Sequence, residues 1–138
     1  QRQMCIRDRE HSVIGLGSDL IDIRRIENTL LKFGDRFKKR IFTKNEIKKC
    51  EKRKENVACY AKRFAAKEAA AKALGTGFRN GVFWRDLEVT NLPSGKPTIT
   101  FHGNSQLQLK KIANDKEPDI SLTITDEFPY AQAIVTIN

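Results

Sequence analysis

An alanine-rich stretch from Lys62 to Gly77 constrains the fold of this chain more than any other. It reads KRFAAKEAAAKALGTG, and Ala, Lys, Leu, Glu and Arg are the strongest helix formers. Gly75 stands where a C-terminal cap is expected, so the pattern predicts a helix that ends there. The alanines carry little bulk, and another element can therefore approach this helix closely.

Steps of four residues place Phe64, Glu68 and Lys72 on one face of the predicted helix. A carboxylate and an ammonium one turn apart are consistent with two interpretations. They can hold a metal and a phosphate, or they can form a surface ion pair that contributes only about 0.3–0.5 kcal/mol. Taken alone, the helix favours the ion pair, because such pairs are common.

The composition indicates one globular domain with a modest core, since 138 residues include 39% hydrophobic and 31% charged side chains. No apolar run approaches the roughly 20 residues that span a bilayer. Residues 1–12 are polar and lack the apolar middle of a secretory signal. We interpret them as a disordered or extraneous tail and assign the single domain to residues 13–138. Cys5, Cys50 and Cys59 lack metal-ligand spacing, so we expect reduced thiols in a cytoplasmic protein.

The net charge of +9 is concentrated in one segment. From Lys32 to Lys54 there are eleven Lys or Arg residues against three acids, which gives this segment +8. Such a patch attracts an acidic partner, which can be a nucleic acid, a membrane surface or an acidic protein. The alternative is a solvated helix face without a partner.

The segment Val13 to Asp22 predicts a short strand with Asp19 at its end. An acid in so apolar a segment is unusual, because acids are rarely buried unless they are paired or bound to a metal. Asp19 therefore either binds a metal or caps the next helix. That helix is expected from about Ile23 to Leu31, and Gly34 ends it.

Further along the chain, Thr43 and Glu46 form a capping box, which predicts a helix from Lys44 to about Arg53. A short basic turn is expected before it. Apolar residues alternate with polar ones near the C-terminus, as in half-buried antiparallel strands. The expected elements of the second half are strands at about Leu87–Asn91 and Lys96–Phe101, a helix at Asn104–Ala113, and strands from Ile120 and Ala131. Helices thus come first and strands later, which predicts an α+β fold.

Two segments read together resemble the holo-acyl-carrier-protein synthases, a family of phosphopantetheinyl transferases. The first is IGLGSDLIDI at Ile14–Ile23, and the second is RFAAKEA at Arg63–Ala69, which runs on to Gly77. Gly95-Lys96-Pro97 fits at the hairpin turn. The match in order and spacing covers nearly the whole folded chain. It implies the fold of that family, a small antiparallel sheet packed with helices.

The resemblance also implies a reaction. These enzymes move the 4′-phosphopantetheine arm of coenzyme A to a serine hydroxyl of apo acyl carrier protein in fatty acid biosynthesis, require Mg²⁺, and release 3′,5′-ADP. Asp19 and Glu68 match the metal-binding carboxylates, and Lys72 matches the lysine beside the phosphates. These three residues are the expected catalytic set. Two acids from separate elements suit Mg²⁺, which prefers oxygen ligands.

The resemblance further implies binding sites and partners. Family members are usually cytoplasmic homotrimers with active sites between subunits, and neither a nucleic acid nor a membrane is implied. The small, acidic carrier protein is a partner for the basic segment. Coenzyme A contacts are expected at Arg63, Lys72, Gly75, Gly77 and Lys96, and carrier contacts at Arg25, Arg36, Lys39 and Arg40.

The chain departs from the family pattern at Ile124, which stands where many members have a histidine. A mechanism that relies on a histidine there is excluded. We interpret His11 and His102 as tail and surface residues. Two other functions stay open, a basic nucleic-acid-binding domain and a catalytically silent relative that only binds coenzyme A or the carrier. The joint presence of Asp19, Glu68 and Lys72 argues against the silent relative.

Overall fold

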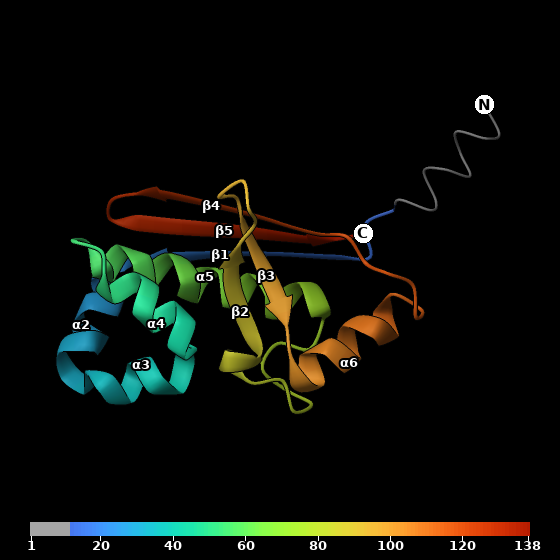
Figure 1. The fold of residues 1–138 in the computed structure, drawn as a ribbon, viewed down its shortest axis with the longest axis horizontal. Coiled ribbons are helices and arrows are strands. Elements are labelled where there is room, and N and C mark those ends of the chain that lie inside the picture. The colour runs from blue at the N-terminus through green and yellow to red at the C-terminus, as the bar shows by residue number, and fades with distance from the viewer. Residues whose placement is uncertain (1–11) are drawn as a thin grey trace.

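A computed structural model describes residues 12–138 of the chain (Figure 1). The tail expected at residues 1–12 therefore lies outside the described residues, apart from Ser12. The elements in order are β1 (Gly15–Asp22), α2 (Ile23–Phe33), α3 (Asp35–Ile41), α4 (Lys44–Glu51), α5 (Asn56–Leu74), the 3₁₀ turn η1 (Trp84–Asp86), β2 (Leu87–Asn91), β3 (Pro97–Phe101), α6 (Gly103–Ile112), β4 (Ile120–Glu127) and β5 (Tyr130–Ile137). The predicted α+β class is confirmed.

Three strands form the larger antiparallel sheet in the order β1-β5-β4, and β2 pairs with β3 in a separate hairpin. Every second residue of β5 is buried, namely Ala131, Ala133, Val135 and Ile137. This alternation is the pattern seen in the sequence, and it means that one face of the sheet packs on the core. No helix among residues 12–138 is long and apolar enough to cross a membrane.

Helix α5 lies along the inner face of this sheet, with α2, α3 and α4 towards one of its ends and α6 towards the other (Figure 1). Its alanines at positions 61, 65, 66, 69 and 70 have no exposed surface. Gly75 ends the helix in the left-handed conformation, with φ of 81°, and its N–H donates to the Lys72 carbonyl. The predicted helix and cap are therefore confirmed.

Two glycines let β1 approach the backbone of α5. A Cβ atom added at Gly17 would stand 1.8 Å from the Ala69 carbonyl oxygen, and one at Gly15 would stand 2.2 Å from the Ala73 carbonyl oxygen. Real Cβ atoms do not come so close, so any larger residue would push strand and helix apart. Small residues on both elements thus set their separation.

The structure corrects four expectations about the first half of the chain. Asp19 lies in the middle of β1, because the strand continues to Asp22. Asp22 caps α2, with its Oδ1 accepting from the Arg24 N–H at 2.9 Å. The expected basic turn is a regular helix, α3, and α4 ends at Glu51 before the predicted Arg53. The Thr43–Glu46 capping box is present as predicted.

The expectation of reduced thiols is wrong for Cys50 and Cys59, which form a disulfide between the last turn of α4 and the first turns of α5. Their Cα atoms are 5.5 Å apart, within the range that a disulfide bridges. Spacing along the sequence did not reveal the pair, because the turn between the two helices brings the cysteines together. Cys5 lies outside the described residues.

Candidate active site

Asp19 reaches α5 because of its register in β1. Odd-numbered residues of the strand face the helix, so Gly17 and Ile21 are buried on either side of it. Asp19 lies between them, and its side chain is only 10% exposed. The two glycine contacts therefore bring a carboxylate against the middle of α5.

Lys72 meets this carboxylate from α5. Its Nζ lies 3.0 Å from Asp19 Oδ1 and donates a second hydrogen bond, also 3.0 Å, to the Ser18 carbonyl. The ammonium end remains open to solvent, since the side chain is 55% exposed. Lys72 is thus anchored at one side and free to contact a ligand at the other.

Glu68 lies one turn before Lys72 and completes the cluster. Burial, together with the hydrogen bond and the negative charge of Asp19, raises the pKa of Glu68 to about 7, while Lys72 and Arg25 oppose the shift. Two carboxyl groups this close cannot both ionise cheaply, so they tend to share a proton. The site is therefore stabilised either by a bound cation or by protonation of one carboxylate.

The structure thus brings together Asp19, Glu68 and Lys72, the three residues predicted to be catalytic. Among residues 12–138, no group of three or more His, Cys, Asp or Glu side chains is arranged to hold a metal. Two carboxylates are nevertheless the protein share of many Mg²⁺ sites, where phosphates and waters supply the other ligands.

The residues predicted to contact coenzyme A lie apart. Arg63 is buried, and its Nη1 donates to the Cys59 carbonyl and Sγ while its Nε has no hydrogen-bond partner. It lines a pocket of about 180 Å³ together with Lys62 and Ile124. Gly75 lies twelve residues further along the chain, about 18 Å by helical rise.

The other two predicted contacts lie in turns. Gly77 has a positive φ of 58° in the segment after α5, and its N–H donates to the Ala71 carbonyl. Lys96 is exposed in the turn between β2 and β3. Pro97, the residue that follows it, lines the pocket that also contains Arg63.

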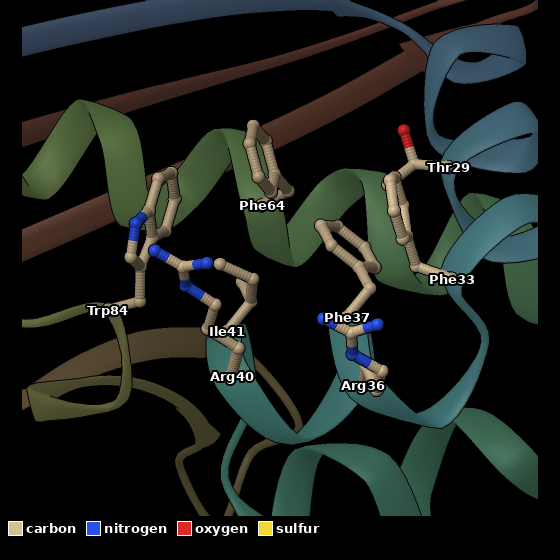
Figure 2. Close-up of a pocket in the computed structure, with 8 residues that line it drawn as sticks. All are labelled: Thr29, Phe33, Arg36, Phe37, Arg40, Ile41, Phe64 and Trp84. Carbon is tan, nitrogen blue, oxygen red and sulfur yellow. The ribbon is translucent and has the colours of Figure 1, made fainter.

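The basic helix α3 borders an apolar groove of about 410 Å³ (Figure 2). The aromatic side chains of Phe33, Phe37, Phe64 and Trp84 lie in a row across it, and Arg36 and Arg40 reach the same opening. Lys39 is exposed on the same helix. Arg25 lies on α2, where its charge acts on Glu68. Figure 2 therefore shows two of the four predicted carrier contacts at one groove.

Lys38 does not belong to this open basic surface. Its Nζ lies 3.2 Å from Glu51 Oε2, which also accepts a hydrogen bond of 2.6 Å from the Tyr60 hydroxyl. These two contacts attach α3 to α4 and α5. The basic run is thus divided between side chains that hold helices together and side chains that face solvent.

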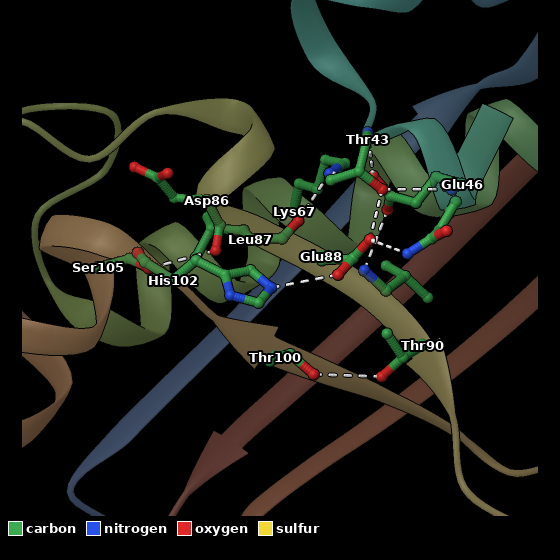
Figure 3. Close-up of polar contacts among 12 residues, drawn as sticks. Thr43, Glu46, Lys67, Asp86, Leu87, Glu88, Thr90, Thr100, His102 and Ser105 are labelled. Carbon is green, nitrogen blue, oxygen red and sulfur yellow. Dashed lines mark hydrogen bonds and ion pairs between the residues drawn. The ribbon is translucent and has the colours of Figure 1, made fainter.

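Sequence reasoning missed the pair Lys67 and Glu46, which Figure 3 shows together with their polar neighbours. Their side chains have no exposed surface, and Lys67 Nζ lies 2.6 Å from Glu46 Oε1. One signal was present in the sequence. An alanine-rich helix face packs closely against its neighbours, and a lysine that is buried on such a face requires an acid as its partner.

Ile124, which replaces the histidine of many family members, lies in the same row of the sheet as Asp19. Asp19 is paired with Ala133 in β5, and Ala133 is paired with Ile124 in β4, so the three form one row across the sheet. In this chain the row ends in an apolar side chain. His102 is half exposed and hydrogen-bonds Glu88 at 3.1 Å, and His11 lies outside the described residues.

Comparisons with known proteins agree with this arrangement. The family model of the 4′-phosphopantetheinyl transferase superfamily matches residues 15–131. A holo-[acyl-carrier-protein] synthase of Brucella ovis is 58% identical over 126 residues, which cover 91% of this chain and 94% of the relative. The structure of holo-[acyl-carrier-protein] synthase from Neisseria meningitidis matches with a TM-score of 0.79 at 34% identity, over 91% of this chain and 98% of that one. The Bacillus anthracis synthase in complex with CoA (3′,5′-ADP) matches with a TM-score of 0.73 at 34% identity, over 91% and 96%.

Proposed function

The chain belongs to the 4′-phosphopantetheinyl transferase superfamily, and on that premise we propose that its active site lies where Asp19, Glu68 and Lys72 meet. The chain transfers the 4′-phosphopantetheine group of coenzyme A to a serine hydroxyl of apo acyl carrier protein. We assign this activity to residues 13–138 as one cytoplasmic domain that serves fatty acid biosynthesis. The main support for this site is the contact of β1 with α5, which brings Asp19 against Glu68 and Lys72.

The donor set fits Mg²⁺. Asp19 and Glu68 offer carboxylate oxygens from a strand and a helix, and burial together with the closeness of Asp19 raises the pKa of Glu68 to about 7. A bound Mg²⁺ would supply charge neutralisation for the pyrophosphate of coenzyme A. Lys72, anchored on Asp19 and Ser18, directs its exposed ammonium end at the same phosphates as a point charge. The departing product is then 3′,5′-ADP.

The proton of the attacking serine stays near the same residues. Carboxylate oxygens of Asp19 and Glu68, or a water that they orient, are the acceptors at this site. Ile124 occupies the end of the row that Asp19 begins, and its hydrocarbon side chain cannot accept a proton there.

Coenzyme A extends along α5. Arg63, with its unpartnered Nε, and Lys96 suit one phosphate at the pocket near β3, while Lys72 serves the pyrophosphate. Gly75 and Gly77, at the far end of the helix, leave open backbone for another part of the ligand, since a Cβ atom added to either would meet nothing within 4 Å. An extended ligand is required, because about 18 Å separates Arg63 from Gly75.

The carrier protein docks on the groove of Figure 2. Its acidic side chains face Arg36, Lys39 and Arg40 from α3, and Arg25 from α2 guides the serine towards Glu68. The apolar floor, which includes Phe37 and Phe64, receives an apolar face of the partner. Charge at the rim mainly controls the rate of encounter and the choice of partner.

The open face of the larger sheet supports a homotrimer with active sites between subunits. Even-numbered residues of β1 point away from α5, and Leu16 and Leu20 are 64% and 61% exposed. Ile134 on the neighbouring β5 is 37% exposed on the same face. Large apolar side chains grouped on one face typically mark an interface.

A transfer assay read by mass spectrometry tests this function. Purified protein with Mg²⁺, coenzyme A and apo carrier should add the phosphopantetheine mass to the carrier, and Asp19→Ala or Glu68→Ala should abolish the addition while the protein stays folded. Absence of a mass shift at high enzyme concentration would refute the transfer. Tight, salt-dependent binding of random DNA at physiological ionic strength would instead support the nucleic-acid-binding alternative.

A further inference from the structure

A fully buried ion pair joins Lys67 of α5 to Glu46 of α4 (Figure 3). Besides its contact with Glu46, Lys67 donates hydrogen bonds to the Leu87 carbonyl at 2.6 Å and to the Trp84 carbonyl at 3.2 Å. An ammonium group has three hydrogens, so these three acceptors satisfy it completely. Burial lowers the pKa of Lys67, and the charge of Glu46 opposes this shift.

Both carboxylate oxygens of Glu46 also accept hydrogen bonds within the protein. Its Oε1 accepts from the Thr43 N–H at 2.9 Å as part of the capping box, and its Oε2 accepts from the Val89 N–H at 3.0 Å. The pair therefore joins three parts of the chain: the start of α4, the middle of α5, and the segment from η1 into β2. Burying two charges costs several kcal/mol per ion, so stability alone does not require charged residues here.

The segment held in this way carries one wall of the groove. Trp84, whose carbonyl Lys67 binds, stacks on Phe64 with ring centroids 4.6 Å apart and on Phe78 with centroids 3.8 Å apart. Phe64 and Trp84 line the groove, and Lys67 lies outside it. Lys67 also lies on a different face of α5 from Glu68, which contacts Asp19.

We propose that Lys67, held by Glu46, is a positioning residue that sets Trp84 as one wall of the groove and thereby determines affinity for the carrier protein. The inference rests on the proposed docking of the carrier at that groove. Because Lys67 touches neither the carboxylate pair nor Lys72, the binding of coenzyme A and the chemical step do not depend on it.

The test uses Lys67→Met, which keeps the length of the side chain and removes the charge. Trp84 is the single tryptophan of the chain, so intrinsic fluorescence reports on this wall alone. The expected result is a rise in the carrier KM on the order of tenfold, a shifted Trp84 emission, and a kcat and a coenzyme A KM within about twofold of the parent.

Two further variants separate positioning from general stability. Leu122→Ala opens a cavity in β4, where Leu122 is 2% exposed, and should lower stability without changing Trp84 emission or the carrier KM. If Lys67→Met does not fold, the double variant Glu46→Gln/Lys67→Met decides, since it leaves no unpaired buried charge.

Parent-like emission and carrier KM in a folded Lys67 variant would overturn the inference. An equal rise of the carrier KM in Leu122→Ala would also overturn it, because the effect would then follow stability alone. Failure of the parent protein to transfer the arm would instead refute the proposed function. The emission of Trp84 would in that case still show whether Lys67 sets the position of the wall.

Discussion

Helix α5 carries a lysine–carboxylate pair on each of two faces, Lys67 with Glu46 and Lys72 with Asp19. In the first pair both side chains are 0% exposed. In the second the lysine is 55% exposed and the carboxylate 10%. The same two chemical groups on one helix are thus placed in opposite environments.

The difference lies in how completely the charges are satisfied. Lys67 and Glu46 form their hydrogen bonds within the protein, so a ligand would add little to the stabilisation of either charge. Burial and the neighbouring Asp19 raise the pKa of Glu68 to about 7, so its ionised form is poorly stabilised within the protein. A poorly stabilised charge of this kind is typical of ligand-binding sites, whereas a fully hydrogen-bonded buried ion pair is typical of a structural role.

The largest expected effect is on the buried pair. Lys67→Met should lower the free energy of unfolding by about 3–5 kcal/mol, because it leaves Glu46 charged and unpaired in the core. The matched control is Lys72→Met, the same substitution on the other face, which should cost no more than about 1 kcal/mol. Urea unfolding measures both. Equal losses in the two variants would contradict the distinction between the faces.

The second effect concerns the contact that creates the exposed pair. Gly17→Ala adds a Cβ atom 1.8 Å from the Ala69 carbonyl oxygen, so β1 must move away from α5 by more than 1 Å. Displacement on this scale at a reacting centre costs about a hundredfold in rate. We expect a loss of about that size in kcat/KM for transfer. Ser18→Ala, one residue along on the outer face, should keep the parent rate, and a Gly17→Ala variant that keeps it as well would show that the separation is not critical.

Local patterns in the sequence predicted much of the fold. The capping box at Thr43 and the glycine cap at Gly75 depend on neighbours within one turn, and both are present. The alternation in β5 has the same local origin. Asp22, by contrast, was missed as the cap of α2 even though it directly precedes Ile23, the first residue of the expected helix.

Local sequence patterns predicted the candidate site only in part. Asp19, Glu68 and Lys72 were identified through family resemblance, and residue patterns alone favoured a surface pair between Glu68 and Lys72. Lys72 binds Asp19 instead, because the fold brings a strand 53 positions away against the helix. The second role of Glu46, as partner of Lys67, likewise arises from packing between elements and has no local pattern.

The disulfide is the other feature that packing revealed, and its loss should have an intermediate effect. It closes a loop with a sequence separation of 9 between Cys50 and Cys59. Loop entropy then gives a stabilisation of roughly 2–3 kcal/mol. Reduction of the parent protein should lower its urea midpoint accordingly, while Cys50→Ala should be insensitive to reductant. A parent protein with two reactive thiols at these positions before reduction would refute the bond.

The smallest expected effect concerns the exposed face of α5, where the stability of the fold should depend on pH. Burial and Asp19 raise the pKa of Glu68 from 4.5 to about 7, so the folded protein holds this proton more tightly than the unfolded chain does. Ionising Glu68 therefore destabilises the fold increasingly as pH rises from about 4.5 to 7, and the loss is complete above that range. Glu68→Gln, which cannot ionise, should melt near the parent temperature at pH 4.5 and above it at pH 8, in metal-free buffer.

Thermal unfolding across this range measures the difference between the two proteins, with Glu117→Gln, an exposed loop position, as the control that should show no such trend. A difference independent of pH would mean that Glu68 titrates as an ordinary surface acid and that the carboxylates are not in contact. Added Mg²⁺ should stabilise the parent at pH 8 and leave Glu68→Gln little changed, because the ion relieves the same repulsion that the substitution removes. The pH trend and the Mg²⁺ response should therefore disappear together in this variant, whereas both should persist in Lys67→Met, which leaves the exposed face intact.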